Sequence, residues 1–209
     1  MKTHPKLIFE TEARTRGFAL IAGIDEAGRG PWAGPVTAGA VILPPDFTHA
    51  TLNDSKQLSE TQREELYGEI TAHPSIRWAV GLASPEEIDS LNILQATHLA
   101  MRRAVDQLLP TPDFLLIDGR PVKSFTLPRQ SIVKGDSKSL SIAAASVLAK
   151  VTRDRLMLEF DREFPQYGFS RHKGYGTPEH QAALKQHGIC RIHRKSFAPV
   201  RLVAERTLL

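Results

Sequence analysis

The sequence FALIAGIDEAGRGPWAGP, from Phe18 to Pro35, carries the clearest indication of how this chain folds. Its first half is an apolar run of the length of a buried strand, and this run ends on two neighbouring carboxylates, Asp25 and Glu26. Its second half is rich in glycine and proline, which are typical of a tight turn. The stretch therefore predicts a buried strand that carries two acidic side chains to its end, directly before a glycine-rich turn.

Strands and helices alternate in the rest of the chain. Further apolar strands are expected at 36–43, 76–83, 114–117 and 131–133. Capping residues and glycine or proline stops predict helices at 59–72, at 84–109 with a break, at 139–164 and at 177–188. Three strands come first and strands then alternate with helices, which indicates an α/β sheet with helices packed on it.

Carboxylates at the ends of strands are the pattern that points to chemistry. Asp118 closes one later apolar run, and Asp136 follows another. Unpaired carboxylates among apolar residues are costly, so a cluster of them is expected to bind cations, and oxygen ligands favour Mg²⁺ or Mn²⁺ over zinc. Taken singly, each acid could instead belong to a turn, because Asp118-Gly119 and Gly135-Asp136 are common turn dipeptides.

The neighbours Asp25 and Glu26 leave two arrangements open, because consecutive residues of a strand point to opposite faces. In one arrangement, Asp25 faces the site and Glu26 reaches round as the strand ends. In the other, the backbone twists into the glycine-rich turn and turns both side chains toward one place. The sequence does not decide between them.

The charged residues are unevenly distributed along the chain. There are 27 lysines and arginines against 23 acidic residues, with the acidic excess in 54–113 and the basic excess in 114–209. This asymmetry fits a polyanion lying along one face, although a solvated basic surface gives the same pattern. A carboxylate cluster beside a basic surface suits phosphodiester hydrolysis, in which one metal generates the attacking hydroxide and a second stabilises the leaving oxygen. The basic residues concerned are Lys134, Lys138, Lys150, Arg153, Arg155, Arg171, Lys173, Arg191, Arg194 and Lys195.

The composition argues against several other classes of protein. Cys190 is the only cysteine, so neither an internal disulfide nor a cysteine metal cluster can form. The histidines, among them His172, His187 and His193, do not have the spacing of a zinc site. The N-terminal residues lack the apolar core of a signal peptide, and no apolar run is long enough to span a membrane. We therefore expect a cytoplasmic protein without membrane contact.

Seven ordered blocks of sequence resemble the signature of bacterial ribonucleases HII, the type 2 ribonucleases H. They are GIDEAGRGPWAGPV at 23–36, NDSKQL at 53–58, IDG at 117–119, VKGDSK at 133–138, AASVLAKVTRDR at 144–155, HKGYGT at 172–177 and HRKSF at 193–197. The match covers nearly the whole chain, and seven blocks in order are far more specific than any one of them.

The resemblance implies a ribonuclease H-like α/β fold, with a central mixed β-sheet flanked by helices and a small helical C-terminal part. We expect one catalytic domain over 1–209, with the sheet and helix core at about 18–165 and the helical part at about 166–209. The arginine in the turn and the absence of an extra N-terminal domain favour type HII over type HIII. Trp32 is a departure, because the resemblance implies a smaller aliphatic residue there.

The resemblance also implies roles for residues. The family's four catalytic and metal-binding carboxylates match Asp25, Glu26, Asp118 and Asp136. The turn that reads the ribonucleotide matches Gly28, Arg29 and Gly30. Tyr175 matches the tyrosine that stacks against the sugar beside the ribonucleotide.

The implied activity is that of a metal-dependent endonuclease that uses Mg²⁺ or Mn²⁺. It would hydrolyse the RNA strand of RNA–DNA hybrids and cut at ribonucleotides embedded in duplex DNA, leaving 5′-phosphate and 3′-hydroxyl ends. Its partners would be these nucleic acids, and we expect a monomer.

Three basic residues are further candidates for binding substrate. Lys56 lies between a strand and a helix, where a lysine and turn amides could hold a phosphate, although a plain surface turn explains the pattern equally well. Lys150 and Arg153 share a helix face and could follow a strand backbone, but Asp154 could pair with them locally.

Two alternatives to a ribonuclease H are an inactive nucleic-acid-binding module and a metal-dependent nuclease that acts on DNA junctions. The presence of all four carboxylates argues against an inactive module. The turn at 28–30 together with Tyr175 argues against a nuclease that acts on DNA alone.

Overall fold

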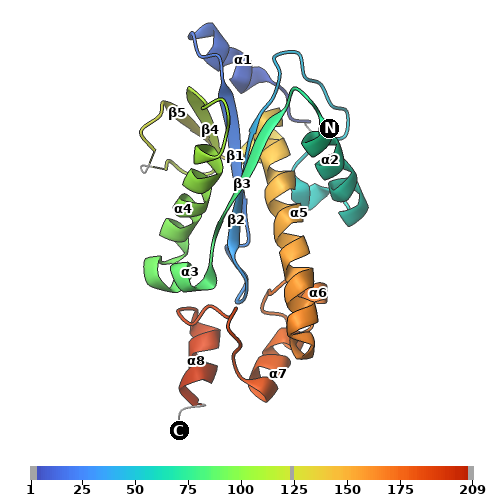
Figure 1. Ribbon diagram of the computed structural model, residues 1–209, viewed down its shortest axis with the longest axis vertical. Coiled ribbons are helices and arrows are strands. Elements are labelled where there is room, and N and C mark those ends of the chain that lie inside the picture. Colours follow the sequence, from blue (N-terminus) through green and yellow to red (C-terminus); the bar gives the residue numbers. More distant parts are fainter. Residues whose placement is uncertain (1–3, 123–124, 207–209) are drawn as a thin grey trace.

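The computed structural model describes residues 4–122 and 125–206, which form a five-stranded sheet with helices on both faces (Figure 1). The order of strands across the sheet is β3-β2-β1-β4-β5, so the first strand lies at its centre. The strands are β1 Ile21–Ala27, β2 Val36–Ile42, β3 Arg77–Ala83, β4 Phe114–Asp118 and β5 Arg129–Ile132.

The sheet is mixed, and its parallel half sets the position of the acidic residues. β1 pairs antiparallel with β2 and β2 antiparallel with β3, whereas β1, β4 and β5 run parallel to one another. Ile24 of β1 pairs with Ile117 of β4, one residue before Asp25 and Asp118 in each strand. Because parallel strands end at the same edge of a sheet, these two aspartates arrive side by side.

Two long helices cover the two faces of the sheet (Figure 1). α5 Leu140–Glu163 packs on β1 and β2 from one face, and α4 Ile93–Asp106 packs on β2 and β3 from the other. The other helices are α1 Ile8–Thr15, α2 Glu60–Ala72, α3 Pro85–Leu91, α6 Phe169–His172, α7 Pro178–His187 and α8 Ala198–Arg206. Single turns of tighter helix lie at Ser55–Gln57, Gly135–Ser137 and Pro165–Tyr167.

Glycines in the sheet allow α5 to approach its backbone. A Cβ atom on Gly23 would lie 2.2 Å from the carbonyl carbon of Ser141, and one on Gly39 would lie 2.4 Å from a backbone oxygen of the same helix. Any side chain at these positions would push the helix away. Because Gly23 faces α5, the alternation of a strand places Asp25 on the α5 face and Glu26 on the opposite, α4 face.

All the predicted strands and helices are present, with shifted ends. The predicted break in the helix at 84–109 is at Asn92, whose φ is 72° and whose side chain accepts hydrogen bonds from two amides of the next turn. α4 ends at Asp106 rather than at 109. The sequence signals miss α1, α6 and α8, and the first two begin without a side-chain cap.

The C-terminal part is helical, as expected, and carries an apolar cluster of its own. Met157 near the end of α5 packs there with Tyr167, Phe169, Leu184 and Ile192. This part meets the rest of the fold beyond the end of β1, where the glycine-rich turn lies (Figure 1). That the chain is a single domain stays a prediction. Within the described residues, no helix is both long enough and apolar enough to cross a membrane.

Candidate active site

Three of the four predicted carboxylates form a cluster at the end of the parallel strands. Asp25, Asp118 and Asp136 each offer an oxygen atom, and these atoms lie within 4.8 Å of one another. The main chain holds two of them in place. Asp25 Oδ1 accepts a hydrogen bond from the Glu26 amide at 2.7 Å, and Asp118 Oδ1 accepts one from the Gly135 amide at 2.6 Å. The second bond ties the end of β4 to the turn that carries Asp136.

The cluster is electrostatically strained in the absence of cations. Burial raises the pKa of Asp25 well above its ordinary value, and the charges of Glu26, Asp118 and Asp136 raise it further. Burial, Asp54 and Asp118 raise the pKa of Asp136 to about 6. Carboxylates that repel one another in this way are stabilised by a divalent cation, and a set of oxygen donors fits Mg²⁺ or Mn²⁺. These residues therefore fit a divalent metal.

Glu26 is not among the three carboxylates whose oxygen atoms lie within 4.8 Å of one another, but its charge is close enough to raise the pKa of Asp25. β1 continues through Ala27, and because successive side chains of a strand alternate, Asp25 and Glu26 leave β1 on opposite faces. On its own face, Glu26 accepts a hydrogen bond from Arg29 Nη1 at 3.1 Å. Burial raises the pKa of Glu26, and the Arg29 guanidinium partly offsets this rise. Its role as a metal ligand stays a prediction.

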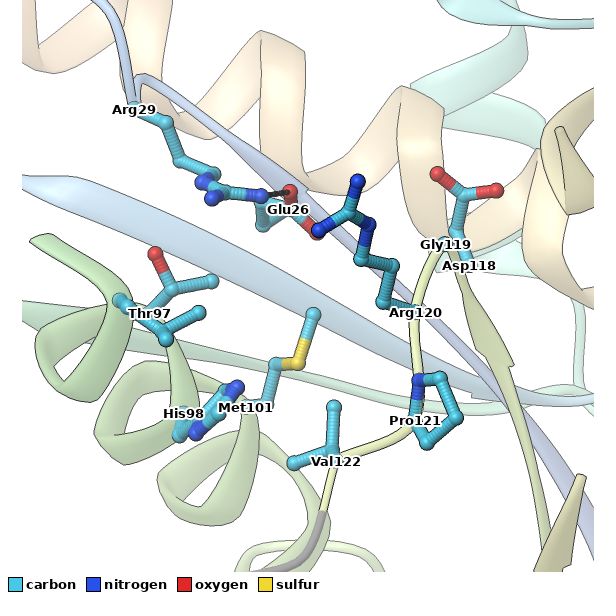
Figure 2. Close-up of a pocket in the computed structure, with 11 residues that line it drawn as sticks. Glu26, Arg29, Thr97, His98, Met101, Asp118, Gly119, Arg120, Pro121 and Val122 are labelled. Atoms are coloured by element: carbon cyan, nitrogen blue, oxygen red, sulfur yellow. Dashed lines mark hydrogen bonds and ion pairs between the residues drawn. The ribbon is translucent and has the colours of Figure 1, made fainter. Parts of the chain in front are cut away.

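The face on which Glu26 lies opens into a pocket of about 500 Å³ (Figure 2). Asp118 and the exposed Arg120 border this pocket beside Glu26, and Thr97, His98 and Met101 of α4 line its other side. The two carboxylates thus reach one opening from different strands. Arg29 and Arg120 make the opening suitable for an anionic ligand.

Lys56 lies beside Asp136 of the aspartate cluster. Its Nζ atom is 3.6 Å from Asp136 Oδ2 and 4.0 Å from Asp54 Oδ1. Burial works against the charged form of Lys56, but Asp25, Asp54, Asp136 and Asp118 together hold its pKa above the ordinary value. Asp54 was not among the predicted site residues, although it lies in one of the blocks that carry the family resemblance. Its position beside Asp136 makes it a fifth carboxylate of the site.

The seven predicted substrate-binding residues all line one pocket of about 260 Å³, which Glu26 also borders. They are Gly28, Arg29, Gly30, Lys56, Lys150, Arg153 and Tyr175. The Tyr175 side chain is exposed, and its ring lies 3.7 Å from where a Cβ atom on Gly30 would be. The turn and the tyrosine thus form two walls of one pocket beside the acidic cluster.

Comparison with known proteins identifies the family. The family model described as Ribonuclease HII matches residues 22–200. A ribonuclease HII of Acetivibrio thermocellus is 56% identical over 190 residues, which cover 91% of this chain and 74% of the relative. A ribonuclease HII of Syntrophotalea carbinolica is 54% identical over 195 residues, or 93% of each chain. This chain belongs to the ribonuclease HII family.

The fold agrees with the family. The crystal structure of ribonuclease H2 from Pyrococcus horikoshii OT3 superposes with a TM-score of 0.74 at 28% identity, and the match covers 90% of this chain and 98% of that one. The chain is therefore a ribonuclease H, with the mixed sheet and the helical C-terminal part expected of this fold. The resemblance to bacterial ribonucleases HII is confirmed.

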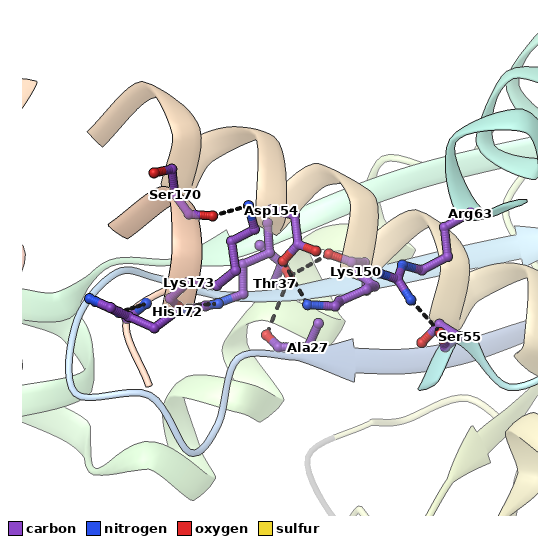
Figure 3. Close-up of polar contacts among 12 residues, drawn as sticks. Ala27, Thr37, Ser55, Arg63, Lys150, Asp154, Ser170, His172 and Lys173 are labelled. Atoms are coloured by element: carbon purple, nitrogen blue, oxygen red, sulfur yellow. Dashed lines mark hydrogen bonds and ion pairs between the residues drawn. The ribbon is translucent and has the colours of Figure 1, made fainter. Parts of the chain in front are cut away.

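Lys150 and Arg153 occupy this ribonuclease HII site in different ways. Lys150 Nζ donates to Asp154 Oδ1 at 2.7 Å, the local pair that was one of the two interpretations of the sequence (Figure 3). Arg153 is only 1% exposed, and its guanidinium donates to the carbonyl oxygens of Pro35, Ala33 and Lys173. Arg153 thus holds the backbone behind the turn. Direct contact of either residue with a phosphate stays a prediction.

The predicted basic face is narrower than the sequence suggests. Arg155, Arg171 and Arg191 pair with glutamates, and Arg194, like Arg153, is buried. Of the basic residues that the sequence singled out, those that line an opening with Asp118 and Asp136 in this family member are lysines. Lys56, Lys134 and Lys138 line a second opening of about 820 Å³ that reaches Asp118 and Asp136.

Two buried histidines of the site were not predicted. His180 and His193 lie beneath the Tyr175 loop, with their Nε2 atoms 3.1 Å apart, and the Trp32 ring lies tilted against His180 with its centroid 5.6 Å away. A Cβ atom on Gly176 would lie 2.2 Å from the Trp32 ring, so this tryptophan, the departure from the family, packs under the loop that carries Tyr175. Histidine spacing in the sequence serves only as a signal of zinc binding. These two histidines form hydrogen bonds with each other and with main-chain groups, and no spacing pattern indicates such bonds.

Proposed function

We propose that this chain is a metal-dependent endonuclease that hydrolyses the RNA strand of RNA–DNA hybrids and cuts at ribonucleotides embedded in duplex DNA, leaving 5′-phosphate and 3′-hydroxyl ends. One observation carries the proposal: the pocket formed by the turn at 28–30 and Tyr175 adjoins both openings on the aspartate cluster. It shares Glu26 with the opening that Arg120 borders, and it shares Lys56 with the opening that Lys134 and Lys138 line. A sugar held by the turn would therefore place its phosphodiester next to the carboxylates.

The metal would be Mg²⁺ or Mn²⁺, held by Asp25, Asp118 and Asp136, with Glu26 within reach from the other face of β1. When bound, such a metal activates water and neutralises the charge that develops on the phosphate. The chain itself supplies the geometry: β1 and β4 set two aspartates side by side, and the Gly135 amide fixes the orientation of Asp118. Lys56 adds a positive charge beside Asp136 that can hold a phosphate oxygen.

Recognition of ribose would come from the turn and the tyrosine. The 2′-hydroxyl is the only group that separates the two sugars in one strand, and it both donates and accepts hydrogen bonds. Gly30 lets main-chain groups approach the sugar because it has no side chain, and Gly28 lets the turn pack on Arg153. Tyr175, with its ring exposed across the pocket from Gly30, would lie against the neighbouring sugar. A nuclease for DNA junctions alone has no need of such a pocket.

A cleavage experiment with mapped products tests the proposal. End-labelled substrates would be an RNA–DNA hybrid, a DNA duplex with one ribonucleotide, and the same duplex without it, each with Mg²⁺, Mn²⁺ or chelator. We expect the first two to be cut only with metal, with a 3′-hydroxyl that a polymerase extends and a 5′-phosphate that a ligase accepts. Cleavage of the all-DNA duplex at a similar rate, or full activity in chelator, would contradict the proposal.

We further propose that the protein acts as a monomer in the cytoplasm. Its nucleic-acid substrates arise where nucleic acid is copied, and the aspartate cluster and the sugar pocket lie close enough within this chain to act without residues of a second copy. Sedimentation of the protein with and without a ribonucleotide-containing duplex tests the first part. One protein chain bound to each duplex is the expected result, and a stable dimer would contradict it.

A further inference from the structure

The segment 190–194 lies between the two walls of the sugar pocket. The Gly34 amide donates to the Ile192 carbonyl at 2.9 Å, and the Arg194 amide donates to the Trp32 carbonyl at 2.8 Å. Trp32 in turn donates its amide to Gly174, the residue before Tyr175. Two consecutive side chains of the segment, His193 and Arg194, then reach in different directions, one toward the tyrosine loop and one toward the turn.

Arg194 holds the turn through its carbonyl oxygens. Its Nη2 atom donates to the carbonyl of Gly28 at 2.5 Å, Nη1 donates to that of Arg29 at 3.0 Å, and Nε donates to that of Gly34 at 2.9 Å. The side chain is completely buried, and it forms no ion pair with any described residue. Since a guanidinium has donors and no acceptor, its fixed fork specifies where these three carbonyls must point.

This contact also fixes the direction of the amides in the turn. In a trans peptide the carbonyl and the following N–H point in opposite directions, and the peptides of the turn are trans. Because the carbonyls of Gly28 and Arg29 point inward to Arg194, the amides of Arg29 and Gly30 point outward. Among the described residues, neither amide has a protein acceptor. Arg194 therefore leaves two neighbouring donors free for a substrate oxygen.

His193 reaches the other wall through His180. The Cys190 amide donates to His193 Nδ1 at 2.9 Å, so the proton of His193 is on Nε2. This Nε2–H donates to His180 Nε2 at 3.1 Å, and His180 Nδ1–H then donates to the Tyr175 carbonyl at 3.0 Å. The backbone amide at the start of the relay decides both tautomers, and the relay ends on the main chain of Tyr175.

We propose that His193 and Arg194 are a positioning pair that fixes both walls of the sugar pocket, Arg194 acting on the turn at 28–30 and His193 acting through His180 on Tyr175. The inference rests on the proposed function, because it concerns the recognition of ribose. Neither residue touches the substrate. Since the two are adjacent in the chain, they set the distance between the outward amides and the tyrosine ring, and hence whether a ribose is held beside the carboxylates.

The first test uses variants of the relay. His193→Phe keeps an aromatic ring among Tyr167 and Phe169 but removes the hydrogen bonds, whereas His193→Gln keeps a donor amide for His180. We expect His193→Phe to lower the single-turnover rate on a duplex with one ribonucleotide by about tenfold, the loss of one buried hydrogen bond. His193→Gln should restore most of the rate. Mn²⁺ binding, measured by calorimetry, should not change in either variant.

A double-mutant cycle shows whether His193 acts through Tyr175. If it does, His193→Phe in the background of Tyr175→Ala should cause no further loss of rate. Additive losses would overturn the proposal, as would equal rates for the Phe and Gln variants. If His193→Phe fails to fold, the single-turnover rates of His193→Gln and wild type are compared instead. A tenfold lower rate for His193→Gln, which keeps the donor, would contradict the proposed role of that donor. His187→Phe, an exposed histidine nearby, is the matched control.

The second test replaces the fork of Arg194. Arg194→Lys keeps the charge but cannot span three carbonyls, so we expect about a tenfold loss or more in the rate at a ribonucleotide and little change in Mn²⁺ affinity. Arg191→Lys, at an exposed arginine paired with Glu163, is the control and should cleave like wild type. A wild-type rate for Arg194→Lys would overturn the role of Arg194. If the wild-type protein itself does not cut at the ribonucleotide, the proposed function fails rather than this inference.

Discussion

The Nε atom of Arg153 lies where a side chain at Gly28 would begin, since a Cβ atom there would be 2.0 Å away from it. Gly28 also has a φ of 94°, a conformation that other residues rarely adopt. Only glycine can therefore take this position without backbone strain and without displacing Arg153. Gly30 differs, because it lacks a positive φ and the nearest atom to its Cβ position is the Tyr175 ring at 3.7 Å.

This difference predicts opposite behaviour for two alanine variants. Gly30→Ala should fold with a melting temperature close to that of wild type, yet lose most of its cleavage at a ribonucleotide, because the added methyl group occupies the sugar pocket. Gly28→Ala should be destabilised by at least about 1 kcal/mol, because the methyl group displaces Arg153 and the backbone is strained. Thermal unfolding and cleavage assays measure both effects. An active Gly30→Ala would show that the sugar does not lie against the turn.

Asp25→Asn and Asp118→Asn should abolish cleavage while leaving the fold intact. Each change removes one ligand charge with little change in volume, and the new amide side chain in Asp25→Asn would still offer an oxygen to the Glu26 amide. Because burial and its neighbours disfavour the charged form of Asp25, the metal-free Asp25→Asn variant should melt at the same temperature as wild type or higher. Melting curves in chelator check the predicted stability, and cleavage assays with metal check the predicted loss of activity. Substantial activity in both variants is the outcome that contradicts the site.

Binding of a divalent metal should release protons. Burial, Asp54 and Asp118 raise the pKa of Asp136 to about 6, and the pKa of Asp25 is also raised, so part of the cluster is protonated in the metal-free protein at a pH near 6. A metal binds the deprotonated form, so its affinity should rise with pH through about 6 and fall in more acidic solution. Calorimetry in buffers of different ionisation enthalpy measures the number of protons released. A heat of binding that does not depend on the buffer would contradict the prediction.

Acid should destabilise the C-terminal part through its buried histidines. Burial lowers the pKa of His180 and His193 to about 4, and neighbouring imidazoles contribute to this lowering. In the unfolded chain histidine titrates near about 6.5, so the unfolded state binds more protons between about 4 and 6.5. The stabilisation is therefore complete above about 6.5 and is lost as the pH falls toward 4. The free energy of unfolding, measured with urea at several pH values, should fall less steeply with acid for His180→Phe than for wild type. An equal fall in the two proteins would contradict the prediction.

The sequence predicted the strands and the meeting of their carboxylates because these features are local. An apolar run that ends on Asp25 or Asp118 is visible in a short window, and parallel strands bring their ends to one edge. Capping residues such as Ser84, which accepts from the Glu87 amide, fixed the starts of helices for the same reason. The arrangement of Asp25 and Glu26 was open only because the sequence did not show that β1 continues to Ala27.

The contacts of the two buried arginines, Arg153 and Arg194, could not be predicted from local sequence patterns. Arg194 and Gly28 are 166 residues apart, and Arg153 and Pro35 are 118 apart, so no local pattern connects them. Helical spacing placed Lys150 and Arg153 on a common face of the helix. Only the tertiary packing shows that Lys150 is partly exposed to the pocket, whereas Arg153 is buried under the turn. The histidine relay was missed for a similar reason, because its partners are main-chain groups that carry no sequence signal.

The most direct test of the account is the ratio of cleavage rates on two DNA duplexes that differ by a single 2′-hydroxyl. The rates would be measured under single-turnover conditions with Mg²⁺ and with Mn²⁺, for wild type and for Asp118→Asn. We predict that the wild-type protein cuts at the ribonucleotide alone, that cleavage depends on metal, and that it is lost in Asp118→Asn. Equal rates on the two duplexes, or incision that persists in Asp118→Asn, would contradict a ribose-reading pocket coupled to this carboxylate cluster.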